Sequence, residues 1–286
     1  MTITASMVRE LREMTGGGMM QCKKALEASG GDLQGAVDHL RKQGLKSAAK
    51  KSQRETSEGR VLAAITPDGR RGHLVAVACE TDFLAKGDGF RALVDELAEI
   101  ATASDPDGLD TGDRPFLEQP RSNGAGTVAD LLEGAVAEMG ENIRVVDFAR
   151  LESRAGLVGA YVHHDGKQAA MAAVRTGADA AGARETLKAL CQHIAVYGPE
   201  HANREDVPDE AVEREKAVIM AGNDVQKKPE DIRQKIATGR LEKFFAGIVL
   251  AEQPWIHDDK QSTLKALRQR LGDDARIEAF HRFKIG

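Results

Sequence analysis

The sequence predicts an α+β protein of several domains, and three observations support this prediction. Three short helical patterns separated by glycines fill the first 55 residues, a strand-turn-strand-helix pattern then occurs twice, and two further helical patterns follow. A chain of 286 residues is long enough for two or three domains that each bury a core. We expect a three-helix module with a basic linker (1–55), one core subdomain (56–140), and a second one (141–286) with a helical hairpin at about 209–246. Each core subdomain should hold an antiparallel sheet covered by helices.

The N-terminal module is predicted from helical spacing and glycine breaks. Its first helix carries apolar residues at helical spacing, namely Val8, Leu11 and Met14. The run Gly16-Gly17-Gly18 ends that pattern, a second helix spans 19–28 and ends at Gly30-Gly31, and a third begins near Asp32. Three such helices can share one small core, although a core of this size is marginal below about 60 residues.

The segment 41–54 (RKQGLKSAAKKSQR) is basic and contains no acidic residue. Such a run indicates a solvated linker or an exposed helix. An RNA contact is the alternative interpretation. It is disfavoured because no aromatic residue accompanies the charges for base stacking, and because the whole chain has a net charge of −5.

The segment from Cys79 to Lys86 (CETDFLAK) places an acid beside a large aromatic residue where an apolar strand ends. In the expected strand, 73–78, Val and Leu alternate with small residues, which is typical of a half-buried strand. The next helical pattern begins only at Phe90, so Asp82 and Phe83 are assigned to a connection. An aromatic residue exposed on a loop is more often a partner contact than an accident. The alternative is that Phe83 folds back onto its own sheet while Asp82 caps the next helix.

An internal duplication supports a specific role for the aromatic residue. A constant offset of 97 residues places Gly59 on Gly156 and continues without a gap into the following helix. Each copy has a strand, an Asp-Gly turn and a second strand, as in a β-hairpin, and then a loop and a helix. The first copy has TDFL at 81–84, whereas the second has ADAA at 178–181. Because only one copy has the aromatic residue, a specific task is favoured over a packing need.

The remaining segments complete the predicted organisation. Residues 102–126 are rich in Asp, Gly and Pro, and we expect an irregular excursion before a helix at 127–139. Residues 209–246 predict two helices with a break between them. Residues 247–250 and 279–285 are expected to be further strands of the second sheet.

Composition limits the functional class. The apolar fraction of 41% and the charged fraction of 30% are typical of a globular protein. No apolar run approaches the ~20 residues of a membrane span, and no signal sequence is recognisable, so a cytoplasmic protein without membrane contact is expected. Cys22, Cys79 and Cys191 are odd in number and far apart, which argues against a disulfide framework and a zinc site. The negative net charge gives no general reason to expect direct nucleic-acid binding.

Several motifs, spread over the whole length, share one resemblance. They are Leu11-Arg12, Thr15-Gly16-Gly17-Gly18-Met19-Met20, Cys22-Lys23-Lys24-Ala25-Leu26, Thr81-Asp82-Phe83-Leu84-Ala85-Lys86, Gly140-Glu141-Asn142-Ile143, Tyr161 with His163, His193-Ile194-Ala195, and Gln253-Pro254. In these motifs the chain resembles bacterial elongation factor Ts, the family of guanine-nucleotide exchange factors that act on elongation factor Tu. The resemblance implies the fold expected above, with an N-terminal module of the UBA-like type.

The resemblance also implies a mechanism. A GTPase holds GDP through backbone amides of its phosphate loop, a lysine and a magnesium ion. In this family the residues that match Thr81, Asp82, Phe83 and Leu84 contact the GTPase beside the nucleotide. The aromatic residue wedges between helices of the nucleotide domain, and the acid and its neighbours disturb the groups that position the magnesium ion. The metal is dislodged, the phosphate site loosens, and GDP leaves for exchange with GTP.

Other partner contacts are carried over by the same resemblance. Arg12, Met19, Met20 and Lys23 match positions through which the N-terminal module docks on a helix of the GTPase. Methionines suit such a surface because they are flexible and polarizable. His163 is expected to face the partner. The alternatives are that Met19 and Met20 are core residues of the three-helix bundle and that His163 is an ordinary surface histidine.

Two other functional classes were weighed from the residues. An enzyme would need Glu80 and Asp82 as paired carboxylates, but neighbouring side chains at a strand end point apart and no third ligand follows. No phosphate-binding glycine loop and no Ser/His/Asp or Cys/His arrangement is present, so we expect no catalytic residue, cofactor or metal. A binding module for ubiquitin-like or RNA partners is the second alternative. The helical hairpin is a candidate for self-association.

Overall fold

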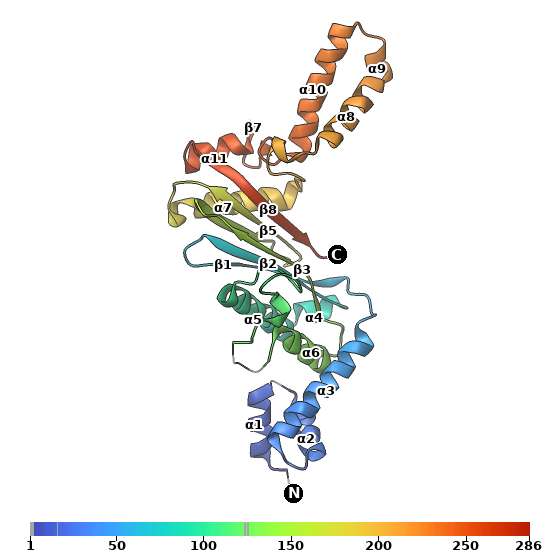
Figure 1. The fold of residues 1–286 in the computed structure, drawn as a ribbon, viewed down its shortest axis with the longest axis vertical. Coiled ribbons are helices and arrows are strands. Elements are labelled where there is room, and N and C mark those ends of the chain that lie inside the picture. Colours follow the sequence, from blue (N-terminus) through green and yellow to red (C-terminus); the bar gives the residue numbers. More distant parts are fainter. Residues whose placement is uncertain (1–2, 16, 123, 125) are drawn as a thin grey trace.

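The computed structural model describes residues 3–15, 17–122, 124 and 126–286, and only the backbone of residues 45–49. Gly16, which belongs to the expected glycine break, lies outside the described residues, as does the side chain of Lys46 in the basic segment. The described chain is elongated, with the N-terminal helices at one end and the helices of residues 209–248 at the other (Figure 1). Among the described residues, no helix is long and apolar enough to cross a membrane.

Three helices form the N-terminal end: α1 (Ala5–Thr15), α2 (Met19–Ala28) and α3 (Leu33–Lys51). They share a small apolar core of Val8, Leu11, Cys22, Ala25, Leu26 and Ala36. The helical alternative for the basic segment is correct as far as Lys51, because α3 continues through it.

The third helix connects this bundle to the rest of the protein. It packs against α6 (Val128–Met139). The ammonium of Lys51 donates to the carbonyl of Val136 at 3.0 Å, and the Gln21 amide donates to the carbonyl of Ala137 at 3.3 Å. Both acceptors lie in the last turn of α6, where carbonyls lack the regular intrahelical partner, and the carbonyl of Val136 also accepts from the capping amide of Gly140 at 3.2 Å. The bundle is therefore docked on the C-terminal end of α6.

Two three-stranded antiparallel sheets form the centre, with strand orders β1-β2-β3 and β4-β5-β8. Their strands are β1 (Glu58–Ile65), β2 (Arg71–Cys79), β3 (Arg144–Glu152), β4 (Gly156–Val162), β5 (Gln168–Arg175) and β8 (Arg276–Lys284). The middle strands carry β-bulges at Ala76/Val77 and at Ala173/Val174, which the offset of 97 residues places on each other. The duplication seen in the sequence therefore extends to the strand pairing and to its irregularity.

The two sheets pack face to face, and helices cover both outer faces, which confirms the α+β class. One apolar cluster joins the facing sides of the sheets, through residues such as Leu74 and Met171. The outer face of the first sheet packs against α5 (Asp88–Ser104) and α6, and that of the second against α7 (Ala180–Tyr197) and α11 (Thr263–Leu271). The remaining elements are α4 (Asp82–Lys86), α8 (Asp209–Ala221), α9 (Asn223–Gln226), α10 (Glu230–Ile248), β6 (Pro254–Trp255) and β7 (Asp258–Ser262).

Two expectations about strands are wrong. The strand that ends at Cys79 is buried along nearly its whole length rather than half-buried, because the second sheet covers the face that carries its small residues. Residues 247–250 are not a strand: Gly247 and Ile248 complete α10, and only Val249 forms an isolated bridge, to His201. The expected strand at 279–285 lies largely within β8.

The third strand of the first sheet lies far along the chain from the other two. The sequence predicts that the second subdomain begins at residue 141, but β3 follows that residue and pairs with β2 of the first sheet. Strand pairing places the boundary between the two sheets after Glu152, where β3 ends, and before Gly156, where β4 begins. The division of the chain into three domains stays a prediction.

Candidate functional site

The segment singled out in the sequence forms a short helix and not an irregular connection. The five residues of α4 begin after Thr81, which has extended backbone angles and accepts a hydrogen bond from the amide of Leu84 at 3.2 Å. The helix ends at Gly87. Thr81 is therefore the N-cap of α4. The alternative in which Asp82 caps the next helix is wrong, because Asp82 is the first residue of α4 and Gly87 holds the N-cap position of α5. Five residues are too few for a helical period to be recognised in the sequence.

This short helix turns Phe83 towards solvent. Ala85 is buried in the core beneath the first sheet and Leu84 packs against the same core, whereas Phe83 is 88% exposed. The interpretation in which Phe83 folds back onto its own sheet is therefore wrong. Because the apolar residues of α4 anchor it, the exposed ring stands on a fixed base.

A glycine separates this helix from the next, and the second copy has no such break. In the second copy Asp179 caps α7 by accepting from the amide of Gly182 at 2.8 Å, and the helix then continues to Tyr197. The offset of 97 residues places Gly87 on Arg184, which lies inside α7. Gly87 has extended backbone angles (φ −68°, ψ 148°), so α4 and α5 are two helices with different directions.

The Asp82 carboxylate is exposed and is paired within its own helix. Lys86 Nζ lies 2.6 Å from Asp82 Oδ2, one helical turn away. This hydrogen bond, together with the charge of Lys86, lowers the pKa of Asp82 below its ordinary value. A further positive charge, Lys167 in the β4–β5 turn, acts in the same direction. Asp82 is therefore an ionised, accessible carboxylate beside Phe83.

The neighbouring carboxylate, Glu80, is engaged elsewhere. It accepts from the backbone amide of Asn142 at 2.6 Å and from the guanidinium of Arg54 at 3.3 Å, and the amide hydrogen bond holds its pKa below the ordinary value. The enzyme interpretation needed Glu80 and Asp82 as a working pair, and each of them is held by different partners. Within the described residues, no group of three or more His, Cys, Asp or Glu residues could hold a metal ion.

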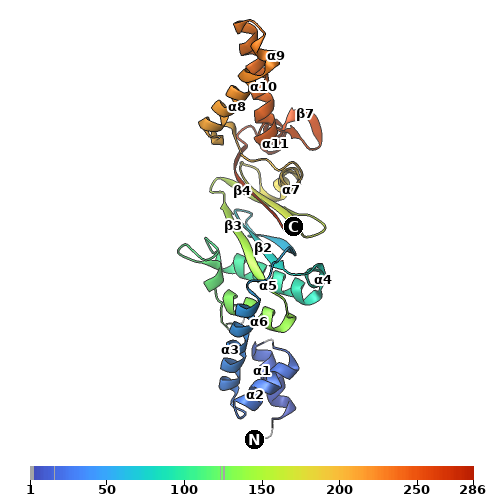
Figure 2. The ribbon, with the colours of Figure 1, turned by 90° about the vertical axis from the view of Figure 1, so that its right-hand side faces the viewer.

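The predicted docking residues of the N-terminal bundle lie at its surface. Met19 and Met20 begin α2 and are 62% and 63% exposed, so the alternative in which they form the bundle core is wrong. Arg12 and Lys23 are exposed as well, and Lys23 is within 3.9 Å of Glu27. Figure 2 shows α4 and the pair of α1 and α2 on the same side of the long axis.

His163 lies just beyond the end of β4. It is half-buried, and its Nδ1 is 2.9 Å from the Tyr161 hydroxyl. Its ring also contacts that of His164, with centroids 4.2 Å apart. The imidazole is therefore oriented by its neighbours and is not a freely solvated surface histidine.

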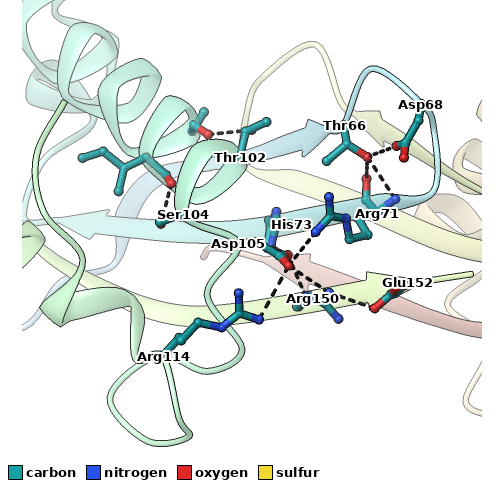
Figure 3. Close-up of polar contacts among 12 residues, drawn as sticks. Thr66, Asp68, Arg71, His73, Thr102, Ser104, Asp105, Arg114, Arg150 and Glu152 are labelled. Carbon is teal, nitrogen blue, oxygen red and sulfur yellow. Dashed lines mark hydrogen bonds and ion pairs between the residues drawn. The ribbon is translucent and has the colours of Figure 1, made fainter.

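A second cluster of charges surrounds Asp105 and has a structural role. Asp105 ends α5 in the left-handed conformation (φ 48°), and Figure 3 shows its carboxylate facing three arginines and a histidine. Arg150 donates at 2.8 and 3.0 Å and Arg71 at 2.8 Å, and these contacts hold the pKa of Asp105 far below its ordinary value. His73 is fully buried with Nε2 3.3 Å from Asp105 Oδ1, and burial lowers its pKa to about 4. The cluster ties the end of α5 to β2 and β3.

Two residues near α4 were given no role from the sequence. Glu141 and Asn142 follow α6, and their hydrogen bonds reach Glu80 and Thr81, about sixty positions earlier. Both belong to the motif Gly140-Glu141-Asn142-Ile143, which is part of the family resemblance, but no local sequence pattern connects that motif with the end of β2.

Comparison with known proteins agrees with this arrangement. The family model described as elongation factor TS matches residues 80–286, which include α4, strand β3 of the first sheet, the whole second sheet and the segment that contacts Thr81. The elongation factor Ts of Magnetococcus marinus is 39% identical over 290 residues, covering 100% of this chain and 93% of the relative. The protein of the same name from Methylococcus capsulatus is 40% identical over 286 residues with the same coverage, and that from Nostoc is 36% identical over 99% of this chain and 92% of the relative. A match of this length and identity, which includes the exposed Phe83 helix, places the chain in the elongation factor Ts family.

Proposed function

We propose that this protein is a guanine-nucleotide exchange factor that binds elongation factor Tu with GDP and promotes exchange for GTP. Membership of the elongation factor Ts family supports this role. The observation that carries the proposal is the 88% exposed ring of Phe83 on a capped and anchored helix. An exposed aromatic residue on a fixed support is suited to enter a partner's pocket, because little side-chain entropy is lost on binding.

In the proposed mechanism the four residues from Thr81 to Leu84 approach the nucleotide site of the GTPase. The Phe83 ring inserts between helices of the nucleotide domain. The Asp82 carboxylate, ionised and exposed, competes for the groups that position the magnesium ion. Loss of the ion removes the main counter-charge of the diphosphate, so GDP dissociates.

Exchange requires negative coupling between the factor and the nucleotide. The factor must bind the empty GTPase more tightly than the GDP form, and by reciprocity GDP or GTP must weaken the factor's own binding by the same amount. Such couplings are commonly about 1–3 kcal/mol. The incoming nucleotide then expels the factor, and the excess of GTP sets the direction of exchange.

The other contacts of the proposal lie on the N-terminal bundle and on the second sheet. Arg12, Met19, Met20 and Lys23 would dock on a helix of the GTPase, in the manner of a UBA-like module, and His163 would face a second part of the partner. The protein would act in the cytoplasm without chemistry of its own and without direct nucleic-acid contact. The helices α8 to α10 would serve self-association.

A nucleotide-release assay tests the proposal. Elongation factor Tu is loaded with fluorescent GDP and mixed with excess unlabelled nucleotide and substoichiometric amounts of this protein. We expect the wild type to accelerate the loss of signal, whereas a passive binding module would not. Phe83→Ala should slow release roughly 30-fold or more, as for an aromatic hot spot, with little change of melting temperature. If the wild type has no effect, the exchange role is wrong; if Phe83→Ala matches the wild type, the role of the ring is wrong.

A further inference from the structure

The helix that carries Phe83 is too short to be stable on its own. With five residues, α4 is far shorter than the helices that persist alone in water. The break at Gly87 also separates it from α5, so the longer helix does not extend and stabilise it. Besides the packing of Leu84 and Ala85, its geometry therefore depends on what holds its first residues, where β2 has ended and the sheet no longer supplies partners. The pairing of β2 with its two neighbours ends at Cys79 and Ala78.

A single carboxylate binds the chain at this point. Glu141 Oε2 accepts from the backbone amides of Glu80 at 3.0 Å and of Thr81 at 2.9 Å, and Glu141 Oε1 accepts from the Thr81 hydroxyl at 2.6 Å. Hydrogen bonds to an ionised acceptor are roughly twice as strong as those between neutral groups. The carboxylate thus replaces the missing sheet partners for two consecutive amides.

The third of these hydrogen bonds also determines how Thr81 caps the helix. A threonine hydroxyl has one hydrogen to donate, and Thr81 commits it to Glu141. A lone pair of the same oxygen then faces the amide of Leu84, which donates at 3.2 Å. Glu141 therefore fixes both the backbone before α4 and the rotamer of its N-cap.

Glu141 is itself held by its neighbours. Gly140 ends α6 in the left-handed conformation (φ 85°), which turns the chain sharply out of the helix. Asn142 is buried, its amide donates to the Glu80 carboxylate at 2.6 Å, and its side chain donates to the carbonyl of Arg54 at 2.8 Å. Residues 80–81 therefore donate hydrogen bonds to Glu141, and Asn142 donates one back to Glu80. Neither segment can shift without breaking these hydrogen bonds.

We propose that Glu141 is a positioning residue for exchange: it sets the direction of α4 and so the place at which Phe83 meets the partner. This inference rests on the proposed function and deepens it. Glu141 acts through Thr81. It is half-buried, and the three hydrogen bonds that its carboxylate accepts come from residues 80 and 81, so the length and shape of the side chain matter more than the charge that it presents to a partner.

Two conservative variants separate positioning from charge. Glu141→Gln keeps the length and one carbonyl oxygen for the two amides, and its NH2 group can donate to the Thr81 hydroxyl oxygen. Glu141→Asp keeps the charge and loses one methylene of reach. Since the charged acceptor makes the stronger hydrogen bonds, we expect the release assay to give a maximal rate for Glu141→Gln within about threefold of the wild type, and a rate at least roughly tenfold lower for Glu141→Asp and Glu141→Ala. The reverse order, with Asp active and Gln inactive, would overturn the proposal in favour of a direct electrostatic role.

A second measurement on the free protein does not depend on the partner. Hydrogen exchange at the amides of Thr81 and Leu84 should be at least roughly tenfold faster in Glu141→Ala and Glu141→Asp than in the wild type, with Glu141→Gln between them. Amides of α6 serve as the internal control and should not change, which would exclude general unfolding. Unchanged exchange at Thr81 and Leu84 in all variants would overturn the positioning role. If instead wild-type protein fails to release GDP while these amides respond as expected, the proposed function fails and the ordering role of Glu141 stands.

Discussion

Lys86 neutralises Asp82 from within the same short helix, with 2.6 Å between the ammonium nitrogen and Oδ2. Because this hydrogen bond is the main cause of the lowered pKa of Asp82, its removal should raise that pKa towards the ordinary value. We expect Lys86→Met to show this rise in an NMR titration of the Asp82 carboxyl carbon. Lys24→Met, at an exposed lysine of α2, is the control and should leave the titration unchanged. An identical titration in Lys86→Met would mean that the pair does not persist in solution.

The carboxylate should matter most when magnesium is abundant. In the proposed mechanism Asp82 helps to dislodge the ion, so Asp82→Asn, which keeps the shape and loses the charge, should slow GDP release mainly at millimolar magnesium. With the metal chelated, the variant and the wild type should release GDP at similar rates. Release assays over a magnesium series check this, and equal impairment with and without the metal would count against a role at the ion.

The sequence was most informative where the signals are local. Glycines mark the ends of the first helices, and the repeat offset placed two β-hairpins correctly because each is continuous in the chain. The pairing of β3 with β2 could not be seen, since about sixty residues of helices and loops separate them. The full burial of β2 was missed for a related reason: its second face is covered by a sheet from later in the chain.

The candidate site, too, could be predicted only as far as local sequence signals reach. Exposure of Phe83 was expected because only one of the two copies has an aromatic residue at this position, and the structure agrees. The helix around it was not expected, since α4 depends on a cap and on distant partners more than on periodicity. In the sequence nothing distinguishes Glu141 from other acidic residues. Only the fold shows that it lies beside the backbone amides of residues 80 and 81.

Burial of His73 should make the stability depend on pH. Its pKa is lowered from 6.5 to about 4, mainly by burial, so the unfolded chain binds a proton in this range when the folded chain does not. The free energy of unfolding should therefore fall as the pH drops from 6.5 to about 4, by up to about 3 kcal/mol from this residue, and level off below. Urea unfolding of His73→Phe over this range should show a shallower fall than the wild type. His164→Phe, at an exposed position, is the control, and a slope equal to that of the wild type in His73→Phe would refute the assignment.

Close contact between α3 and α6 should tolerate one added carbon but not four. A Cβ at Gly44 would lie 3.5 Å from the backbone oxygen of Glu133, an ordinary contact distance. Gly44→Ala should therefore keep the docking and favour the helix by about 0.5–1 kcal/mol. Gly44→Leu should push the N-terminal bundle away from α6 and raise the factor concentration for half-maximal GDP release roughly tenfold at an unchanged maximal rate, as for the loss of ~1.4 kcal/mol of binding. Spin-label distances between α3 and α6 provide the structural check, and equal behaviour of the two variants would show that the contact is not close in solution.

The two exposed methionines of α2 should contribute to binding but not to the release step. The double substitution Met19→Ala and Met20→Ala removes two side chains that are each more than three-fifths exposed in the free protein. Neither side chain belongs to the core of the bundle, so folding should be little affected. Because only a minority of interface side chains cost more than about 1 kcal/mol when truncated, we expect the two substitutions together to cost about 1–2 kcal/mol, so the concentration for half-maximal release should rise roughly 5- to 30-fold. The maximal rate should stay near that of the wild type, because α4 and Phe83 are untouched. Val196→Ala on α7 is the matched control, since Val196 is 64% exposed, close to the value for Met20, and lies outside both the N-terminal bundle and the helices proposed for self-association. A fall in maximal rate without a change in half-saturation would instead assign the methionines to the release step.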